Sequence, residues 1–181
     1  LSDNQTEISL TSYKMDSLQG DSVLAEIYKQ FGVSTAFQVN SISLKKITKV
    51  NASVNIKLDL VNAPDIAQTI AVTCFGLGIA CHLTGLHTLK IKETDRLVAL
   101  KRELEKLGAT VIISKDSLQL KATSMIKKDI AIDTYKDHRM AMAFAPLALK
   151  TNLIINEAEV VSKSYPSFWS DLKATGIRLS E

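Results

Sequence analysis

Cationic, acidic and imidazole side chains gather in a few short stretches of this chain, each directly before a segment with the apolar pattern of a helix. The cations suit a small substrate with several negative charges, because arginine binds carboxylate or phosphate through two parallel hydrogen bonds and lysine adds a compact charge. The acidic and imidazole groups beside them suit proton transfer. The binding candidates are Lys92, Arg96, Arg139 and Lys163, and the proton-transfer candidates are Asp65, Glu93 and His138.

The predicted starts of helices are suitable places for such a site. The first turn of a helix has unpaired N–H groups and a partial positive charge, so it attracts anions. If the helices fold onto a common centre, we expect their cations to converge there. Neighbouring cations favour the ionised form of a carboxylate and burial favours the neutral form, and the sequence leaves that balance open.

Each candidate also has a structural interpretation. Glu93 and Arg96 fit a surface ion pair worth ~0.3 kcal/mol. Asp65, which follows Pro64, fits a residue that complements the helix dipole, worth roughly 0.3 to 1 kcal/mol. His138 fits a hydrogen-bonded structural histidine, and Lys163 an ordinary solvated lysine. The recurrence of these residues at equivalent positions favours the functional interpretation.

The elements that must position them form a repeat. Segments 18–37, 91–113 and 162–179 each begin with polar residues, continue with helical apolar spacing and reach a glycine. In the middle copy the apolar positions are Leu97, Leu100, Leu104 and Leu107, which predicts one buried helix face. The helix-ending glycines are Gly32, Gly108 and Gly176, each suited to the position after a helix.

A second kind of helix, apolar almost all round, precedes two of the copies. It is predicted over 63–83 and 136–150, with Pro64 in a first turn and Pro146 kinking or ending its helix. Predicted strands cover 54–60, 87–91, 109–113, 117–122, 129–134 and 152–156. The unit is therefore strand, buried helix, strand, amphipathic helix and two strands, an α/β (α+β) arrangement.

The boundaries of the repeat predict one domain over 1–181. It contains an incomplete repeat at 1–55 and repeats at 56–122 and 128–181. The first copy has a strand and an amphipathic helix but lacks the buried helix, and the chain begins at Leu1. We therefore expect this sequence to be a C-terminal portion of a longer protein.

The composition excludes several classes of protein. With 46% apolar and 23% charged residues the chain is not expected to be disordered. A net charge of +3 suits anionic ligands but not nucleic acid, which needs clustered Lys and Arg. No membrane span or signal peptide is predicted, so we expect a cytoplasmic protein. Cys74 and Cys81, placed on one predicted helix about 10 Å apart, are expected to be reduced core thiols rather than a disulfide or metal ligands.

Four motifs in order, "LQGD", "KETDR", "DHRMAMAF" and "SKSYP", resemble the 5-enolpyruvylshikimate-3-phosphate synthase family. The resemblance implies an inside-out, barrel-like α/β lobe of βαβαββ repeats, with helices inside and sheets outside, hinged to a second lobe. It also implies transfer of the enolpyruvyl group of phosphoenolpyruvate to the 5-hydroxyl of shikimate 3-phosphate, with release of phosphate and no metal or organic cofactor. The implied partners are these anionic substrates and the N-terminal lobe, with no nucleic acid or membrane; a monomer is expected.

Roles follow from the resemblance residue by residue. Asp65 resembles the base for the shikimate hydroxyl, and Glu93 the acid that protonates the phosphoenolpyruvate methylene and later removes a proton from it. Lys92 and Thr88 resemble shikimate 3-phosphate ligands, although some members have asparagine in place of Thr88. The phosphoenolpyruvate pocket, which generally binds glyphosate, is implied for Arg96, Arg139 and Lys163, with His138 beside it.

Two alternatives remain open. The related transferase that acts on UDP-N-acetylglucosamine shares the architecture, and its reactive cysteine lies in the other lobe, so Cys74 and Cys81 do not decide; "KETDR" and "DHRMAM" favour the shikimate enzyme. The second alternative is a non-catalytic anion-binding or scaffolding domain. For the isolated chain we expect an inactive half of a two-lobed site.

Overall fold

The predicted βαβαββ unit is present in full in the middle of the chain. The structure, a computed structural model, describes residues 1–13, 15, 17–92 and 94–180. The unit consists of β4 (Asn55–Asp59), α2 (Ala67–Leu77), β5 (Ala80–Thr84), α3 (Arg96–Lys106), β6 (Val111–Ile113) and β7 (Leu118–Leu120). A short 3-10 helix precedes each helix, η2 (Pro64–Ile66) before α2 and η3 (His87–Ile91) before α3.

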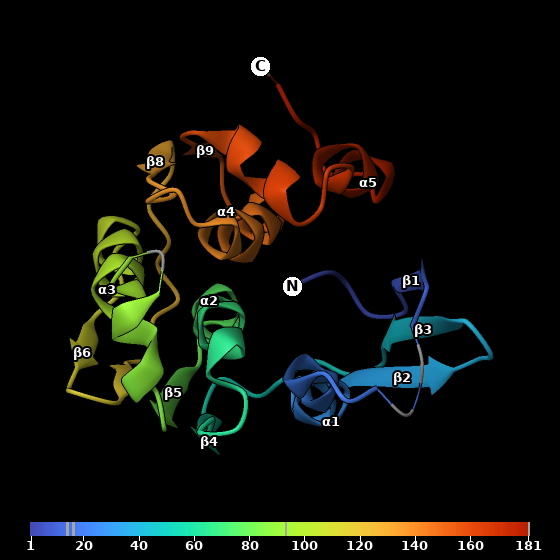
Figure 1. Cartoon of the computed structure of the whole chain (residues 1–181), viewed down its shortest axis with the longest axis horizontal. Helices are drawn as coiled ribbons and strands as arrows, with labels where there is room; N and C mark the ends of the chain where they lie inside the picture. Colours follow the sequence, from blue (N-terminus) through green and yellow to red (C-terminus); the bar gives the residue numbers. More distant parts are fainter. Residues whose placement is uncertain (14, 16, 93, 181) are drawn as a thin grey trace. The chain divides into compact units, whose positions relative to one another are not determined.

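The strands of this unit form one mixed sheet in the order β4-β5-β7-β6. β4 and β5 are parallel and are joined through α2, whereas β7 runs antiparallel to both β5 and β6. Both helices lie on the same face of the sheet (Figure 1). The apolar residues that alternate along the strands point toward them and are buried, as the two-residue period of a strand requires. They include Ile56, Cys81, Leu83, Val111, Leu118 and Leu120.

The last third of the chain repeats the first four elements of this unit. Its elements are β8 (Ile130–Ile132), α4 (His138–Phe144), η4 (Ala145–Leu149), β9 (Leu153–Ile155), η5 (Ala158–Lys163) and α5 (Phe168–Ala174). β8 and β9 are parallel, as β4 and β5 are. α4 packs beside α2, with the two sheets on the outer sides of this helix pair (Figure 1). Pro146 lies in the first turn of η4, where the α-helix has ended, which confirms the prediction for that proline.

The first part of the chain repeats the last four elements of the unit. It contains β1 (Glu7–Thr11), η1 (Gly20–Val23), α1 (Leu24–Lys29), β2 (Val33–Phe37) and β3 (Ser41–Lys46). The antiparallel order β1-β3-β2 is that of β5-β7-β6. Residues 2–51 form one compact unit, and residue 1 together with 52–181 forms another. The mixed α/β class is therefore confirmed, and the repeat is visible in both element order and sheet order.

The amphipathic helix α3 has the predicted buried face. Leu97, Leu100, Leu104 and Leu107 are all fully buried. Asp95 caps the helix, because its side chain accepts a hydrogen bond from the Val98 N–H at 3.1 Å. The helix-ending glycines Gly32, Gly108 and Gly176 have φ of 72°, 101° and 95°, a left-handed conformation that other residues adopt only at a cost.

Two predicted elements are wrong. The helix predicted over 63–83 ends at Leu77, because Gly78 adopts a left-handed conformation (φ 74°) and the chain continues into β5. The strand predicted over 87–91 is the 3-10 helix η3. Gly85, with φ 75°, turns the chain away after β5, and the fully buried Leu86 and Leu89 are three residues apart, the period of a 3-10 helix.

The boundary at Gly78 also changes the account of the two cysteines. Cys74 lies on α2 and Cys81 on β5, not on one helix 10 Å apart. Both are buried free thiols, so the prediction of core thiols is confirmed. A hydrogen bond to Cys81, together with burial, raises the pKa of Cys74 well above its ordinary value. Among the residues that the structure describes, no helix is long and apolar enough to cross a membrane.

Candidate functional site

A buried arginine at the start of α3 links two carboxylates from distant parts of the chain. Arg96 donates from Nε to Asp137 Oδ2 at 2.6 Å and from Nη2 to Asp137 Oδ1 at 3.4 Å, a two-pronged contact. Its Nη1 donates to Asp65 Oδ1 at 2.9 Å. The side chains of Arg96 and Asp137 are 2% and 0% exposed, and that of Asp65 is 30% exposed. The Arg96–Asp137 pair is therefore closed to solvent, while Asp65 remains accessible.

Two further cations surround Asp65. Lys92 Nζ lies 3.3 Å from Asp65 Oδ1, and its side chain is 33% exposed. Arg139 Nη1 donates to the Asp65 carbonyl oxygen at 3.1 Å, and Nη2 lies 3.6 Å from Oδ2. Lys92, Arg96 and Arg139, predicted at two separate helix starts, thus converge on one carboxylate in the unit formed by 52–181.

The local sequence explains how each group is placed. Pro64 begins η2, since its missing N–H is not needed at a helix start, and it sets Asp65 in the first turn. Asp137 is the N-cap of α4 and accepts a hydrogen bond from the Arg139 N–H at 2.9 Å. The same carboxylate therefore orients the helix that carries Arg139 and holds Arg96.

This cluster has the composition of an anion site with proton-transfer capacity. Among its described members three cations contact two carboxylates. Lys92, Asp65 and Arg139 are each about one-third exposed and form its accessible part. Cations of this kind bind phosphate and carboxylate, and a carboxylate among them is within reach of a bound hydroxyl. The described residues contain no group of three or more His, Cys, Asp or Glu side chains that could hold a metal ion.

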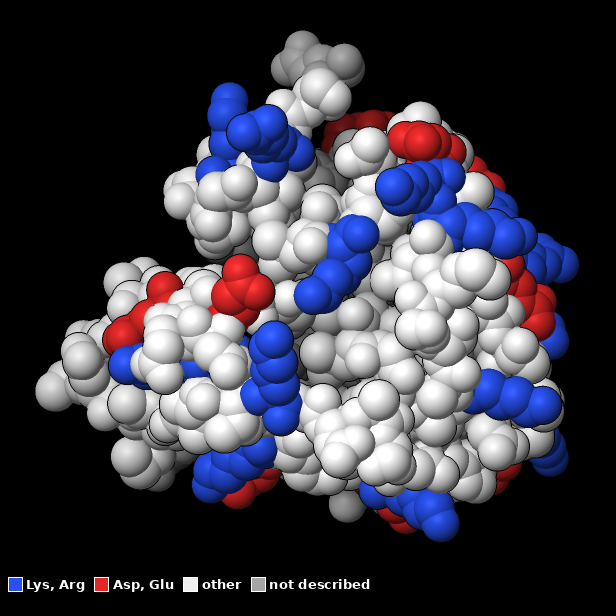
Figure 2. Space-filling view, turned by 180° about the vertical axis from the view of Figure 1, so that it is seen from behind, with Lys and Arg blue, Asp and Glu red and all other residues white. Residues whose placement is uncertain are grey.

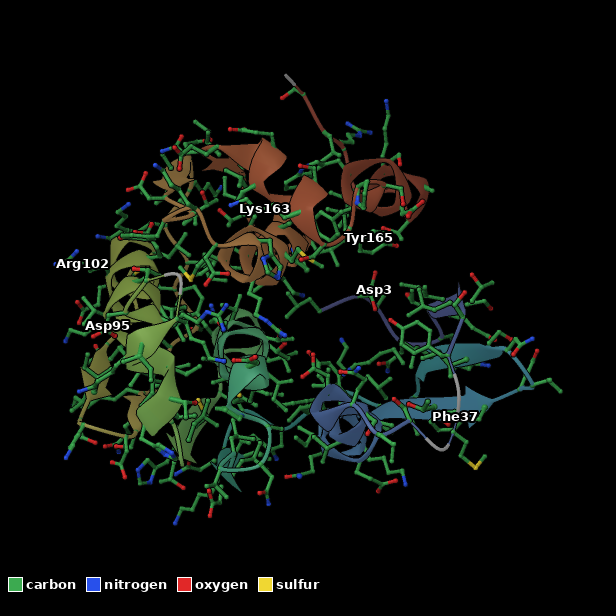
Figure 3. The ribbon with its side chains drawn as sticks, viewed as in Figure 1. Asp3, Phe37, Asp95, Arg102, Lys163 and Tyr165 are labelled. Carbon is green, nitrogen blue, oxygen red and sulfur yellow. The ribbon has the colours of Figure 1, made fainter. Side chains whose placement is uncertain are left out.

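Other predicted residues lie elsewhere or are not described. Lys163 is exposed at the end of η5 (Figure 3), a segment that packs on α4; within 94–180 no ion pair involving it is found. His138 is the half-buried first residue of α4, next to Arg139. Thr88 lies on η3, and its hydroxyl is buried without a hydrogen-bond partner in the part of the chain that the structure describes. Glu93 lies outside the described residues.

Asp137 was visible in the sequence but was not identified there as a site residue. Its N-cap position could be inferred from the polar start of the helix, but its pairing with Arg96, 41 residues away, could not. Glu103 was missed entirely: it sits among the charged residues of α3, yet its side chain is 0% exposed. By contrast Arg102, its neighbour, points outward on the polar face of α3 (Figure 3).

Comparison with known proteins decides the family. A sequence profile described as "EPSP synthase (3-phosphoshikimate 1-carboxyvinyltransferase)" matches residues 3–172. The chain belongs to the EPSP synthase family. This membership agrees with the resemblance that "KETDR" and "DHRMAMAF" indicate, and it gives the cluster around Asp65 a chemical context.

Relatives within the EPSP synthase family are similar to the chain over nearly all of its length. A 3-phosphoshikimate 1-carboxyvinyltransferase of Bacteroides fragilis is 45% identical over 177 residues, which are 95% of this chain and 42% of the relative. One from Neisseria meningitidis is 31% identical over 165 residues, 91% of this chain and 38% of the relative. The chain therefore spans about two-fifths of the length of these relatives.

A solved structure supports the fold. The EPSP synthase of Acinetobacter baumannii aligns with a TM-score of 0.78 at 20% identity, covering 98% of this chain and 44% of that one. At this identity the likeness speaks for the fold of the EPSP synthase family and not for its chemistry.

Proposed function

We propose that the protein to which this chain contributes transfers the enolpyruvyl group of phosphoenolpyruvate to the 5-hydroxyl of shikimate 3-phosphate and releases phosphate. The observation that carries the proposal is the convergence of Lys92, Arg96 and Arg139 on Asp65 in a chain of this family. Both substrates carry several negative charges, so a cluster of cations suits them. The reaction needs a base and an acid but no metal or organic cofactor.

The proposed steps place a proton donor and a proton acceptor at the reacting atoms. Glu93 protonates the methylene carbon of phosphoenolpyruvate, which makes the adjacent carbon electron-poor. Asp65 takes the proton of the shikimate 5-hydroxyl, whose oxygen then bonds to that carbon. Glu93, now a carboxylate, takes a proton back from the new methyl group, and phosphate departs as the carbon–carbon double bond is restored. The exposed edge of Asp65 and its contact with Lys92 at 3.3 Å support its assignment to the hydroxyl.

Binding roles are assigned by exposure and position. Lys92 and Thr88 are proposed to hold shikimate 3-phosphate, although the buried hydroxyl of Thr88 must rotate to reach it. Arg139 and Lys163 are proposed as the accessible cations for phosphoenolpyruvate, with His138 as a neighbouring hydrogen-bond donor. Arg96 is proposed as a fixed cation of the same pocket, because Asp65 and Asp137 determine its orientation.

The test is phosphate release by the full-length protein supplied with both substrates. Glu93→Gln and Arg96→Ala should each reduce turnover by at least a hundredfold, a size typical of lost acid catalysis or of a lost charge at the reacting centre. Arg178→Ala is the matched control, since it removes an exposed arginine from the same unit of the chain. Wild-type turnover in either site variant would refute the assignment.

A non-catalytic anion-binding domain is the second candidate for the isolated chain, because the chain spans 42% of its Bacteroides fragilis relative. We infer that the 181 residues alone do not turn over. A coupled phosphate-release assay that shows robust activity from this chain would contradict the inference. Binding of phosphoenolpyruvate by the full-length protein with no phosphate release would favour the non-catalytic alternative for the whole protein.

The other properties proposed for the whole protein are a cytoplasmic location, a monomeric state and an N-terminal lobe as partner, without nucleic acid or membrane. On the face shown in Figure 2, Lys and Arg of the 52–181 unit are interspersed with Asp and Glu instead of forming one basic surface. Cell fractionation and light scattering of the full-length protein test location and oligomeric state.

A further inference from the structure

Glu103 is a buried carboxylate that the proposed reaction does not use. Its Oε1 accepts a hydrogen bond from the Tyr135 hydroxyl at 2.6 Å. Its Oε2 accepts from Lys106 Nζ at 2.7 Å and from the Asp133 N–H at 3.1 Å. A buried charge is tolerated only when it is paired and hydrogen-bonded. Since Tyr135 and Asp133 follow β8, Glu103 joins α3 to the segment that leads into α4.

That segment contains an unusual turn. Tyr135 and Lys136 have φ of 55° and 58°, so two consecutive residues with side chains adopt the left-handed conformation. Such residues are strained and persist only where their surroundings hold them. Here the phenol is held by Glu103, and Asp133 at the start of the segment is held by Lys106 and Asn156, each at 2.7 Å.

The strained turn ends directly at the site. The next residue, Asp137, receives the Arg96 guanidinium and caps α4. Arg96 and Glu103 are seven residues apart on α3, about two helical turns, so they lie on the same face of the helix. The 133–137 segment is therefore held at both of its ends by one rigid helix, through Glu103 at one end and Arg96 at the other.

The protonation state of Tyr135 suits this contact. Burial, followed by the hydrogen bond and negative charge of Glu103, raises the pKa of Tyr135 above its ordinary value, although Lys106 and Arg102 act in the opposite direction. The phenol thus stays a hydrogen-bond donor to Glu103 throughout the neutral range.

We propose that Glu103 and Tyr135 are positioning residues. Their hydrogen bond maintains the left-handed turn at 135–136 and thereby keeps Asp137 in place as the hydrogen-bond acceptor of Arg96. The described hydrogen bonds of Glu103 lead to Tyr135, Lys106 and Asp133. The consequence for ligand binding rests on the proposed function, because it takes the Arg96 cluster to be the phosphoenolpyruvate pocket.

The test variant is Tyr135→Phe, which removes one hydroxyl and keeps the ring. Its matched control is Thr151→Val, which removes one buried hydroxyl that donates to the Lys127 carbonyl oxygen at 3.2 Å in the same unit. The first readout is the NMR resonance of the Arg96 Nε–H, which reports its bond to Asp137. The second is the midpoint of phosphoenolpyruvate binding to the full-length protein.

We expect Tyr135→Phe to shift the Arg96 Nε–H resonance and the amide resonances of His138 and Arg139. We expect it to raise the phosphoenolpyruvate midpoint about tenfold, the lower end of the effect of losing a hydrogen bond to a charged group. Thr151→Val should leave both readouts as in the wild type. If Tyr135→Phe matches Thr151→Val in both readouts, the proposal is wrong.

A double-mutant cycle that combines Tyr135→Phe with Glu103→Gln provides a second test. If the two residues act through their shared bond, the double variant should shift the Arg96 resonance no further than the stronger single variant; additive shifts would overturn the proposal. Failure of the proposed function is distinguishable, because the wild-type protein would then not respond to phosphoenolpyruvate, whereas the Arg96 resonance tests the positioning role without any ligand.

Discussion

Replacement of Asp137 by alanine should be among the most destabilising single changes in this chain. The substitution removes the two-pronged carboxylate contact of the Arg96 guanidinium, whose side chain is 2% exposed. Removing one member of a buried ion pair costs about 3 to 5 kcal/mol. Loss of the N-cap of α4 adds about 1 kcal/mol. Because a domain has a free energy of unfolding of roughly 5 to 15 kcal/mol, this variant should approach the limit of folding.

The matched control is Asp95→Ala. Asp95 is the N-cap of α3 and accepts from Val98 at 3.1 Å, so its replacement should cost about 1 kcal/mol. Asp137→Asn gives an intermediate case, because asparagine still caps a helix but carries no charge. The difference in the free energy of unfolding between Asp137→Ala and Asp95→Ala therefore measures the contribution of the buried Arg96–Asp137 pair.

The assay is urea unfolding followed by tryptophan fluorescence. Trp169, the single tryptophan of the sequence, donates from Nε1 to the Ala158 carbonyl oxygen at 2.9 Å and reports on the unit that contains Asp137. If Asp137→Ala is no less stable than Asp95→Ala, the buried pair contributes nothing and the reasoning is refuted.

Three further predictions concern other parts of the same unit. Leu100→Ala should lower the free energy of unfolding by about 2 to 5 kcal/mol, whereas Leu149→Ala, at a site 47% exposed, should change it by less than about 1 kcal/mol; equal effects in urea unfolding would contradict the assigned core. Hydrogen bonds from Lys106 and then Asn156 lower the pKa of Asp133 from 3.8, so this carboxylate stabilises the fold above about pH 4 and loses that effect as the pH falls through its lower folded pKa. The stability advantage of the wild type over Asp133→Asn should therefore shrink in acid, and a pH-independent difference would exclude this linkage. Cys74 and Cys81, both buried, should react with a thiol reagent only as the protein unfolds; modification at the rate of a free thiol would show that they are accessible.

Much of the fold follows from local patterns. Leucine spacing predicts the buried face of α3, and Pro64 and Pro146 mark a helix start and a helix end, because proline acts through its own ring and missing N–H. The repeat of element types predicts the βαβαββ unit. These features depend on neighbours within one or two turns, so they are readable from the chain.

The boundaries inside apolar runs are not readable in the same way. Residues 66–83 are apolar with little periodicity, so one long helix and a helix followed by a strand look alike. The left-handed conformation of Gly78 ends α2, and pairing with β4 and β7 makes 80–84 a strand. Tertiary pairing decides this boundary.

The family resemblance, the repeat and the residue types of an anion site were all predictable from the sequence, because motifs and helix periods are local properties. Three features appear only in the folded chain: Arg139 contacts Asp65 across 74 residues, Asp137 binds Arg96, and Glu103 is buried. The physical reason is that burial and ion pairing depend on which helices meet. The spacing of residues along the chain limits which helices can pack together but does not specify which of them do.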